Sequence, residues 1–425
     1  MISILSFNPT NHLKSIYFSA FCINWLFIYP ARVFTPSQST AINSNKTHRN
    51  ILIDILRGIS ISLVLSGHLG LARLNSLTST MQERTGDVKA WFTFASNGAF
   101  GVTIFFVLSG FLISSVLIQS TENWKQLSFR DFYVRRAGRI LPLLSLSCLI
   151  GIMVMDWASP LAQNFDLCFS APTSNGHFWA SIATFTFNWY RIMTENSTYQ
   201  YGYAWGVLWS LSIEEQFYLF YPILLFHLKS SKRSIVAISL VILSGLIWRT
   251  LIYVYYPRQY QLSLNASFGA FDQIAIGCLL YFVHQKLSSS GQMKKFETSC
   301  LMLAGIVIIA WTYWFTSLNN SIDRVYAPTL LSLGVFLFLL GGLQLRISET
   351  FFTRILSWPG QFSYEIYLLH GVVLFLSRKL LILSNPWYSY GLFILVNIPV
   401  GYIAFYGFGK PVNHYIRLHF SSKKV

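Results

Sequence analysis

The sequence predicts an all-α polytopic membrane protein with about ten transmembrane helices. Of its 425 residues, 53% are hydrophobic and only 11% are charged, a balance that is typical of integral membrane proteins. Long apolar segments recur along the chain, each close to the roughly 20 residues that cross the hydrocarbon core as a helix. The 17% of aromatic residues suits belts of Trp and Tyr at the two membrane surfaces.

Ten apolar segments are expected to span the membrane, at 51–71, 98–118, 140–157, 205–227, 234–256, 268–284, 299–317, 326–345, 361–383 and 389–409. Residues 178–193 are too short and too polar for a span, so we expect an interfacial or re-entrant stretch within a long outer loop, 158–204. For the apolar stretch 16–30 an eleventh span, an interfacial helix, a signal-like stretch and an extension from an upstream start codon all stay open.

Loop charges predict the orientation and the three parts of the chain. If residue 50 is cytoplasmic, most Lys and Arg lie in inner loops, as the positive-inside rule requires. The outer loops then hold only Arg73, Arg84, Lys89, Arg191, Arg258 and Arg324. We therefore expect an N-terminal extension with a polar linker (1–50), a membrane domain (51–410) and a basic cytoplasmic tail (411–425).

The same distribution bears on the partners. The formal net charge of +16 follows from the inner loops, so nucleic-acid binding is not expected, whereas contact with membrane lipid is. The five cysteines have no metal-ligand spacing, and most lie in apolar runs. They predict buried thiols, with no metal site and no disulfide framework.

Arg57 and His68, within the first predicted span, are the strongest candidates for a functional site, because ionisable residues in such a helix are costly. Eleven residues of helix return to within about 20° of the same face, about 16 Å further along the axis. Arg57 needs an anion, either Asp54 on the same face or a ligand phosphate, whereas His68 can act as a general base. A structural Asp54–Arg57 pair, with a histidine bonded to a carbonyl, is the alternative.

A basic cluster of Arg135, Arg136 and Arg139 precedes the third span, within about one helical turn. Three guanidinium groups suit the phosphates of a nucleotide-bearing cofactor. The alternative is ordinary anchoring at the cytoplasmic surface or contact with lipid headgroups.

Two adjacent carboxylates, Glu214 and Glu215, lie in the outer half of the span 205–227. They point about 100° apart, so at most one easily faces a given partner, such as an arginine or a catalytic imidazole. An interfacial charge near a helix end is the alternative. Ser210 is a further candidate in the same segment.

Three other segments complete the set of candidates. His370 is a second buried imidazole, for which a structural role is somewhat favoured over a functional one. Asp272 is a further intramembrane carboxylate. The segment 101–114 has no titratable group, and its Gly and Ser residues predict close helix packing rather than chemistry.

The order of five sequence blocks resembles the acyltransferase-3 family of integral membrane acyltransferases. Each block is weakly specific, but the five occur in the family's order between residues 51 and 410. The blocks are Asp54-Ile-Leu-Arg-Gly58 with His68, Gly101-Val-Thr-Ile-Phe-Phe-Val-Leu-Ser-Gly-Phe-Leu-Ile113, Phe132-Tyr-Val-Arg-Arg-Ala-Gly-Arg-Ile-Leu-Pro142, Trp209-Ser-Leu-Ser-Ile-Glu-Glu-Gln-Phe-Tyr218 and Ser363-Tyr-Glu-Ile-Tyr-Leu-Leu-His370.

The resemblance implies transfer of an acyl group from acetyl-coenzyme A, or another acyl-coenzyme A, to a hydroxyl. The usual acceptor is a sugar of a bacterial surface glycan, such as O-antigen, capsule or exopolysaccharide, or its lipid-linked precursor. Arg57 and His68 match the family's catalytic pair, and Arg136 and Arg139 match its Arg-x-x-Arg motif. The implied location is the bacterial inner membrane, with the C-terminus in the cytoplasm.

Two points depart from the family pattern. Many relatives have an arginine two residues before the aspartate of the sixth span, where this chain has Ala270, and this puts the role of Asp272 in doubt. Some relatives carry a C-terminal esterase-like domain. Because the sequence ends at Val425, we expect the membrane unit to act alone or with a partner.

The expected mechanism starts with acyl-coenzyme A entering from the cytoplasm, its phosphates held by Arg136 and Arg139, with or without Arg57. The pantetheine arm extends along the first span to His68, which either deprotonates the acceptor or carries the acyl group to it. Glu214 or Glu215 orients the imidazole. A transporter or flippase of a glycan precursor, and a non-catalytic scaffold, are the rival classes.

Overall fold

The computed structural model describes residues 50–76, 86–119, 129–162, 176–194, 205–291, 293–345, 348–383 and 385–420. All of them belong to one of two compact units in the chain, Asn50–Val425. The predictions for residues 1–49, including the apolar stretch 16–30, lie outside the described residues.

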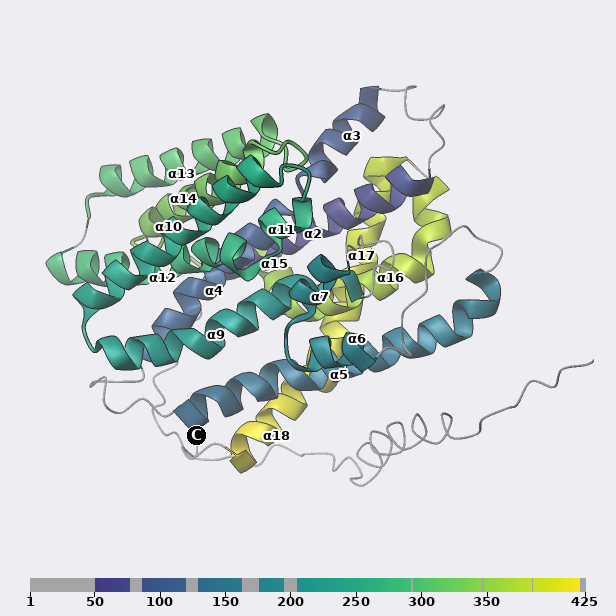
Figure 1. Cartoon of the computed structure of the whole chain (residues 1–425), viewed down its shortest axis with the longest axis horizontal. Coiled ribbons are helices and arrows are strands. Elements are labelled where there is room, and N and C mark those ends of the chain that lie inside the picture. The colour runs from purple at the N-terminus through teal and green to yellow at the C-terminus, as the bar shows by residue number, and fades with distance from the viewer. Residues whose placement is uncertain are drawn as a thin grey trace, which may run out of the picture. The chain divides into compact units, whose positions relative to one another are not determined.

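Every regular element in the described ranges is helical, which confirms the all-α prediction (Figure 1). The helices are α2 (Ile51–Ser76), α3 (Gly86–Ser96), α4 (Phe100–Gln119), α5 (Phe129–Ala162), α6 (Gly176–Ala183), α7 (Phe187–Met193), α9 (Leu208–Leu228), α10 (Ser231–Tyr255), α11 (Tyr260–Leu264), α12 (Ser267–Ser290), α13 (Lys295–Phe315), α14 (Asp323–Gly342), α15 (Phe351–Gln361), α16 (Ser363–Leu383), α17 (Pro386–Ala404), a π-helical turn (Phe405–Gly409) and α18 (Lys410–Phe420).

Eight helical stretches among the described residues are long and apolar enough to cross a membrane. They correspond to eight of the ten predicted spans. The other two, 205–227 and 361–383, form helices α9 and α16, whose polar residues include Glu214, Glu215 and Glu365. The stretch 178–193 forms the short helices α6 and α7, too short to span, as expected.

Helices α4 and α12 are the most enclosed of the spans, and they pack directly against each other. Gly110 of α4 lies against the carbonyl of Ile274, and Gly277 of α12 lies against the carbonyl of Val107. A side chain at either glycine would overlap the partner backbone, so the two glycines set the close approach. This confirms the packing role predicted for the segment 101–114.

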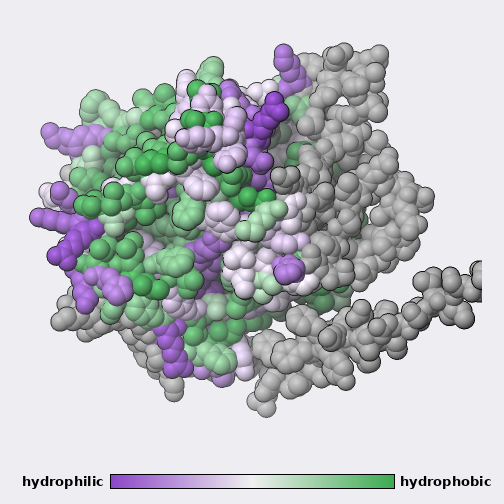
Figure 2. Space-filling view, in the orientation of Figure 1, coloured by the Kyte–Doolittle hydropathy of each residue, from purple (hydrophilic) through white to green (hydrophobic). Residues whose placement is uncertain are grey.

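Helices α10 and α13 carry the opposite character, with apolar side chains on their outer faces. Leu240, Leu243, Ile306 and Val307 are all exposed, as expected for helices that face lipid. Figure 2 shows hydrophobic side chains over much of the face on which these helices lie, with hydrophilic ones gathered at its edge. Exposed basic residues gather at and near the α9–α10 and α12–α13 connections, as expected where helices leave the apolar core of a membrane. They are Lys229, Lys232, Arg233, Lys286, Lys294 and Lys295.

Helix α5 begins at Phe129, eleven residues before the predicted start of its span at residue 140. The added turns carry the arginine cluster and pack against α18. Gly138 lies against Ile416 of α18. The segment expected to be a basic tail is therefore helical through Phe420 and packs on the arginine-bearing helix.

Candidate active site

Two imidazoles meet where α2 packs against α16. The ring centroids of His68 and His370 are 4.8 Å apart, in a T-shaped arrangement. Nε2 of His370 lies 3.4 Å from Nδ1 of His68. His370 is fully buried, whereas His68 keeps partial exposure. Of the two, His68 is thus the imidazole that a substrate can reach.

Backbone carbonyls fix the proton positions on both rings. Nδ1 of His370 lies 2.6 Å from the carbonyl oxygen of Tyr367, and Nδ1 of His68 lies 3.0 Å from that of Val64. A carbonyl oxygen only accepts, so in the neutral rings each Nδ1 carries the proton. Nε2 of His370 then accepts from the shared Nδ1–H of His68. The Nε2 of His68 is left with a lone pair and can act as a base or a nucleophile.

Arg136 of α5 is the centre of a second polar cluster. Its Nη2 lies 2.6 Å from Oε1 of Glu215, and its Nε lies 3.0 and 3.1 Å from the two oxygens of that carboxylate. The guanidinium carbon lies 3.2 Å from the centroid of the Tyr218 ring. Glu214 adds a second carboxylate, with Oε1 3.6 Å from Nη2. Charge-assisted bonds and the aromatic face together hold Arg136 firmly.

Glu214 also accepts hydrogen bonds from two hydroxyl groups. Tyr218 donates at 2.7 Å and Ser109 of α4 donates as well. The expectation that Glu214 or Glu215 orients the His68 imidazole is therefore wrong: the nearby Arg136 guanidinium binds both carboxylates, and His370 occupies the place beside His68.

Ser210 and Tyr367 lie between the two clusters. Their hydroxyl oxygens are 2.6 Å apart. Tyr367 precedes His370 by three residues on α16, and their ring centroids are 5.7 Å apart. Ser210 precedes Glu214 by one turn on α9. The Ser210–Tyr367 pair thus lies one helical turn from Glu214 on α9 and one turn from His370 on α16.

The remaining arginines lie at the other end of α2 and on α5. Arg57 is 3.8 Å from Asp54, with 21% of its side chain exposed. Arg135 donates to the Asp131 carbonyl at 3.0 Å, and Arg139 is exposed. Arg57 and Arg139 both lie within electrostatic range of Glu365. The arginines of α5 therefore differ in their surroundings: carboxylates bind Arg136, whereas Arg139 is exposed.

Asp272 lies in a separate, fully buried network. Arg249 of α10 pairs with both of its carboxylate oxygens, at 2.9 and 2.8 Å, and Thr329 of α14 donates to it at 2.6 Å. Although position 270 is alanine in this chain, Asp272 still contacts an arginine, Arg249 of α10. Both oxygens of Asp272 are thus bonded to partners on two other helices, and the ion pair has no exposed surface, so these contacts tie α12 to α10 and α14.

Sequence reasoning missed Ser109, Tyr218, Tyr367 and Arg191. The two tyrosines lie in the quoted sequence blocks, at helical spacing from Glu214 and His370, and that spacing is a usable signal. Ser109 meets Glu214 only across 105 residues of sequence. Arg191, on α7, is buried and donates to the carbonyl of Gly206 at 3.0 Å.

Residues 50–406 match the model of an acyltransferase domain, which is most of the chain. The chain belongs to the acyltransferase-3 family. Together with its apolar helices, this identifies an integral membrane protein of an acyltransferase family.

Curated relatives extend this picture. The chain is 28% identical over 356 residues to the peptidoglycan O-acetyltransferase OatA of Listeria monocytogenes. This alignment covers 79% of this chain and 51% of that protein. It is 29% identical over 347 residues to the putative peptidoglycan O-acetyltransferase YrhL of Bacillus subtilis, covering 76% and 51%. A putative O-acetyltransferase of Staphylococcus aureus is 24% identical over 301 residues, covering 67% and 47%.

The chain spans about half the length of the curated relatives it matches. No solved structure matches it.

Proposed function

We propose that this protein is an O-acyltransferase that moves an acetyl group from acetyl-coenzyme A to a sugar hydroxyl of a cell-surface glycan. The His68–His370 pair carries the proposal, because its backbone contacts leave Nε2 of His68 with a free lone pair inside a membrane helix. Among glycans, peptidoglycan is favoured over O-antigen, since two of the relatives carry peptidoglycan in their names.

In the proposed reaction, Nε2 of His68 removes the proton from the acceptor hydroxyl. The resulting oxyanion attacks the thioester carbonyl, the new C–O bond forms, and the C–S bond breaks. The departing thiolate takes the proton from Nε2. During the step His68 is cationic, and the Nε2 lone pair of His370 stabilises its Nδ1–H. Alternatively, the same Nε2 lone pair attacks the thioester carbonyl directly, so that the C–S bond breaks and an acyl-histidine forms. The acceptor hydroxyl then takes the acyl group from Nε2.

For the donor we propose a cytoplasmic approach along α2. Arg57 and the exposed Arg139 contact its phosphates, together with Arg135. The guanidinium of Arg136 is committed to Glu215, so we assign it the task of positioning α5 against α9. About 16 Å of helix separates Arg57 from His68, a span that an extended pantetheine arm can bridge.

The test compares His68→Ala and Arg57→Ala in protein reconstituted into nanodiscs, with release of free thiol from acetyl-coenzyme A as the readout. We expect His68→Ala to lose about 100-fold or more of the acceptor-dependent rate, the usual contribution of a general base. His414→Ala is the matched control, because His414 is exposed on α18.

Mass spectrometry of glycan from cells making each variant gives the second readout, and the mass difference identifies the acyl group. Full modification by correctly inserted His68→Ala protein would rule out the assigned base. Glycan transport without thiol release by the wild-type protein would favour a flippase.

A further inference from the structure

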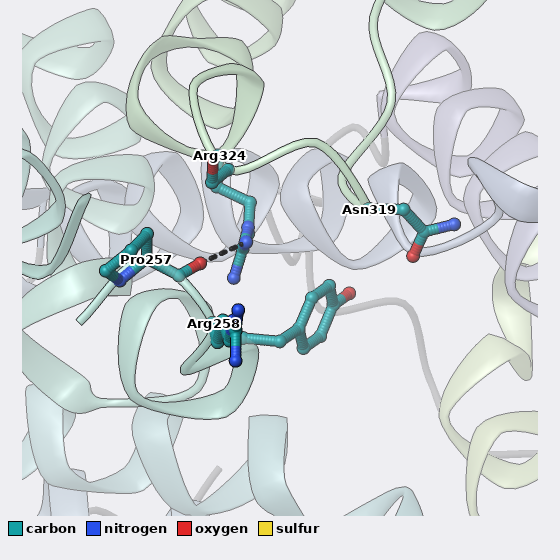
Figure 3. Close-up of a pocket in the computed structure, with 6 residues that line it drawn as sticks. Pro257, Arg258, Asn319 and Arg324 are labelled. Carbon is teal, nitrogen blue, oxygen red and sulfur yellow. Dashed lines mark hydrogen bonds between the residues drawn. The ribbon is translucent and has the colours of Figure 1, made fainter.

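A pocket outside the candidate active site opens between the α10–α11 connection and the loop that leads into α14. Its volume is about 580 Å³. Six residues line it: Pro257, Arg258, Tyr260, Asn319, Ser321 and Arg324 (Figure 3). Two guanidinium groups, an aromatic ring, an amide and a hydroxyl thus face one space, and nothing in the proposed chemistry uses them.

The two arginines give the pocket its charge. Arg324 is only 5% exposed. It donates to the carbonyl of Pro257 at 2.7 Å, and its guanidinium carbon lies 5.6 Å from the centroid of the Tyr260 ring. Arg258 is exposed, and Figure 3 shows Arg324 extending toward it and Pro257.

No carboxylate in the described part of the chain forms an ion pair with Arg258 or Arg324. Asp323 is next to Arg324 in sequence, but its oxygens accept from the amide of Ser317 at 2.9 Å and the hydroxyl of Tyr326 at 2.8 Å. Among the described residues, the pocket therefore presents positive charge with no carboxylate paired to it, and an anionic ligand would complement that charge.

The other lining groups indicate a sugar. The Tyr260 ring offers an apolar face on which a pyranose ring can pack. Asn319 and Ser321 offer an amide and a hydroxyl, which both donate to and accept from sugar hydroxyls. A few convergent polar groups beside an aromatic ring are the kind of lining that fixes the orientation of a small ligand.

Contacts place this pocket at the His68 end of the helices. Gly67, beside His68, packs against Gly98. The amide of neighbouring Asn97 donates to the carbonyls of Tyr313 and Thr316, at 2.6 and 2.8 Å. The chain then runs from Thr316 directly into the pocket loop.

A second link runs through helix α7. Its Arg191 lies within electrostatic range of both the His68 imidazole and the hydroxyl of Tyr260. The pocket and the proposed base thus share a neighbour as well as an end of the molecule.

We propose that this pocket binds the carboxylate or phosphate of an anionic sugar and so holds the acceptor glycan near His68. The assignment as an acceptor site rests on the proposed function, whereas binding of an anionic sugar does not. Arg324 and Arg258 bind the anion, and Tyr260 packs against the sugar ring.

The experiment measures direct binding to purified protein in phosphatidylcholine nanodiscs by isothermal titration calorimetry. The probes are N-acetylmuramic acid, its methyl ester, N-acetylglucosamine 1-phosphate and neutral N-acetylglucosamine. We expect the two anionic sugars to bind about tenfold or more tightly than the methyl ester and the neutral sugar. The difference between carboxylate and phosphate probes identifies the natural anion.

The variants Arg258→Gln and Arg324→Gln should each weaken binding of the anionic sugars about tenfold and leave the weak binding of the neutral sugar unchanged. Arg354→Gln is the matched control, because Arg354 is exposed and lies on α15, outside the pocket. Arg258 is the decisive position: its exposed side chain can be changed without unfolding the loop that Arg324 holds.

Equal binding of all four sugars, or unchanged binding by Arg258→Gln, would overturn the proposal. The proposal would also be overturned if the anionic sugars bound in phosphatidylcholine nanodiscs but not in phosphatidylglycerol nanodiscs. That result would identify the pocket as a site for lipid headgroups. Binding is also measured in His68→Ala protein. Sugar binding without any acyl transfer by the wild type would refute only the proposed function, and acyl transfer without sugar binding would refute only this pocket.

Discussion

At the scale of single residues, the histidine pair shows how a helix can hold a base ready without a carboxylate beside it. Nδ1 of each ring is anchored to a carbonyl one turn back on its own helix. A second neutral imidazole supplies the acceptor that an Asp or Glu supplies in many hydrolases. Such a pair adds no net charge to the membrane interior, and this avoids the cost of a buried carboxylate.

The role of His370 as a positioning residue gives a first prediction. His370→Ala removes the acceptor for the Nδ1–H of His68 and should lower kcat by up to about 100-fold, with little change in KM for acetyl-coenzyme A. His370→Gln, whose amide oxygen can still accept, should restore part of that loss. Steady-state kinetics of folded protein provide the measurement. If the glutamine variant is no better than alanine, the hydrogen bond is not what His370 contributes.

The partner of His68 could not be predicted from the sequence. Asp54, Arg57 and His68 were placed on one helix by spacing alone. The contact with His370 crosses 302 residues of sequence and depends on how α16 packs against α2. Likewise, the sequence does not show that Arg136 of α5 lies beside Glu214 and Glu215 of α9, because that contact depends on how the two helices pack. Without it, either carboxylate could be expected to orient the His68 imidazole.

At the scale of helices, the crossing of α4 and α12 is set by glycine. Gly110 and Gly277 each lie against a backbone carbonyl of the other helix. Close approach gains van der Waals contact between backbones, which is a main source of helix association within lipid. Ser109, which precedes Gly110 on α4, donates a hydrogen bond to Glu214 of α9.

Gly277→Ala tests this crossing. The added methyl group overlaps the Val107 carbonyl, and we expect a loss of about 1–3 kcal/mol of stability from overpacking. Gly391→Ala is the matched control: Gly391 lies in α17 with open space around it, so alanine there should be neutral or stabilising by up to about 1 kcal/mol. Thermal unfolding in detergent compares the two. A lower melting temperature for both, or for neither, would contradict a specific role for Gly277.

Helix positions followed well from hydropathy, and helix ends did not. The predicted span 140–157 is the apolar part of a longer helix, Phe129–Ala162. Its first turns are basic and therefore carry no hydropathy signal, although arginine is a good helix former. Conversely, the apolar residues of α9 and α16 predict two further spans, but neither helix is among the eight long apolar stretches, and the apolar stretch found in α16 is the shorter Ser363–Ser377.

At the scale of the whole molecule, the basic connections predict a single orientation. The exposed lysines and arginines of the α9–α10 and α12–α13 connections face the cytoplasm under the positive-inside rule. The end of α7 and the pocket around Arg258 then face outward. A donor bound near Arg139 and an acceptor bound near Arg324 would reach His68 from opposite sides of the membrane.

Cysteine labelling tests that orientation. Lys232→Cys and Met193→Cys are introduced separately into a cysteine-free background, since both positions are exposed. A membrane-impermeant maleimide added to intact spheroplasts should label Met193→Cys alone, and both variants after lysis. Labelling of Lys232→Cys in intact spheroplasts would invert the predicted topology.

Arg249 and Asp272 belong to helices that leave the ribosome one after the other. A lone arginine within a span raises the free energy of insertion by about 2.5–3.5 kcal/mol, so α10 enters lipid poorly by itself. Asp272 arrives 23 residues later and neutralises it. The ion pair therefore does more than hold α10 to α12: it favours their release from the translocon together, as a charge-neutral hairpin, and so sets an order of assembly during synthesis.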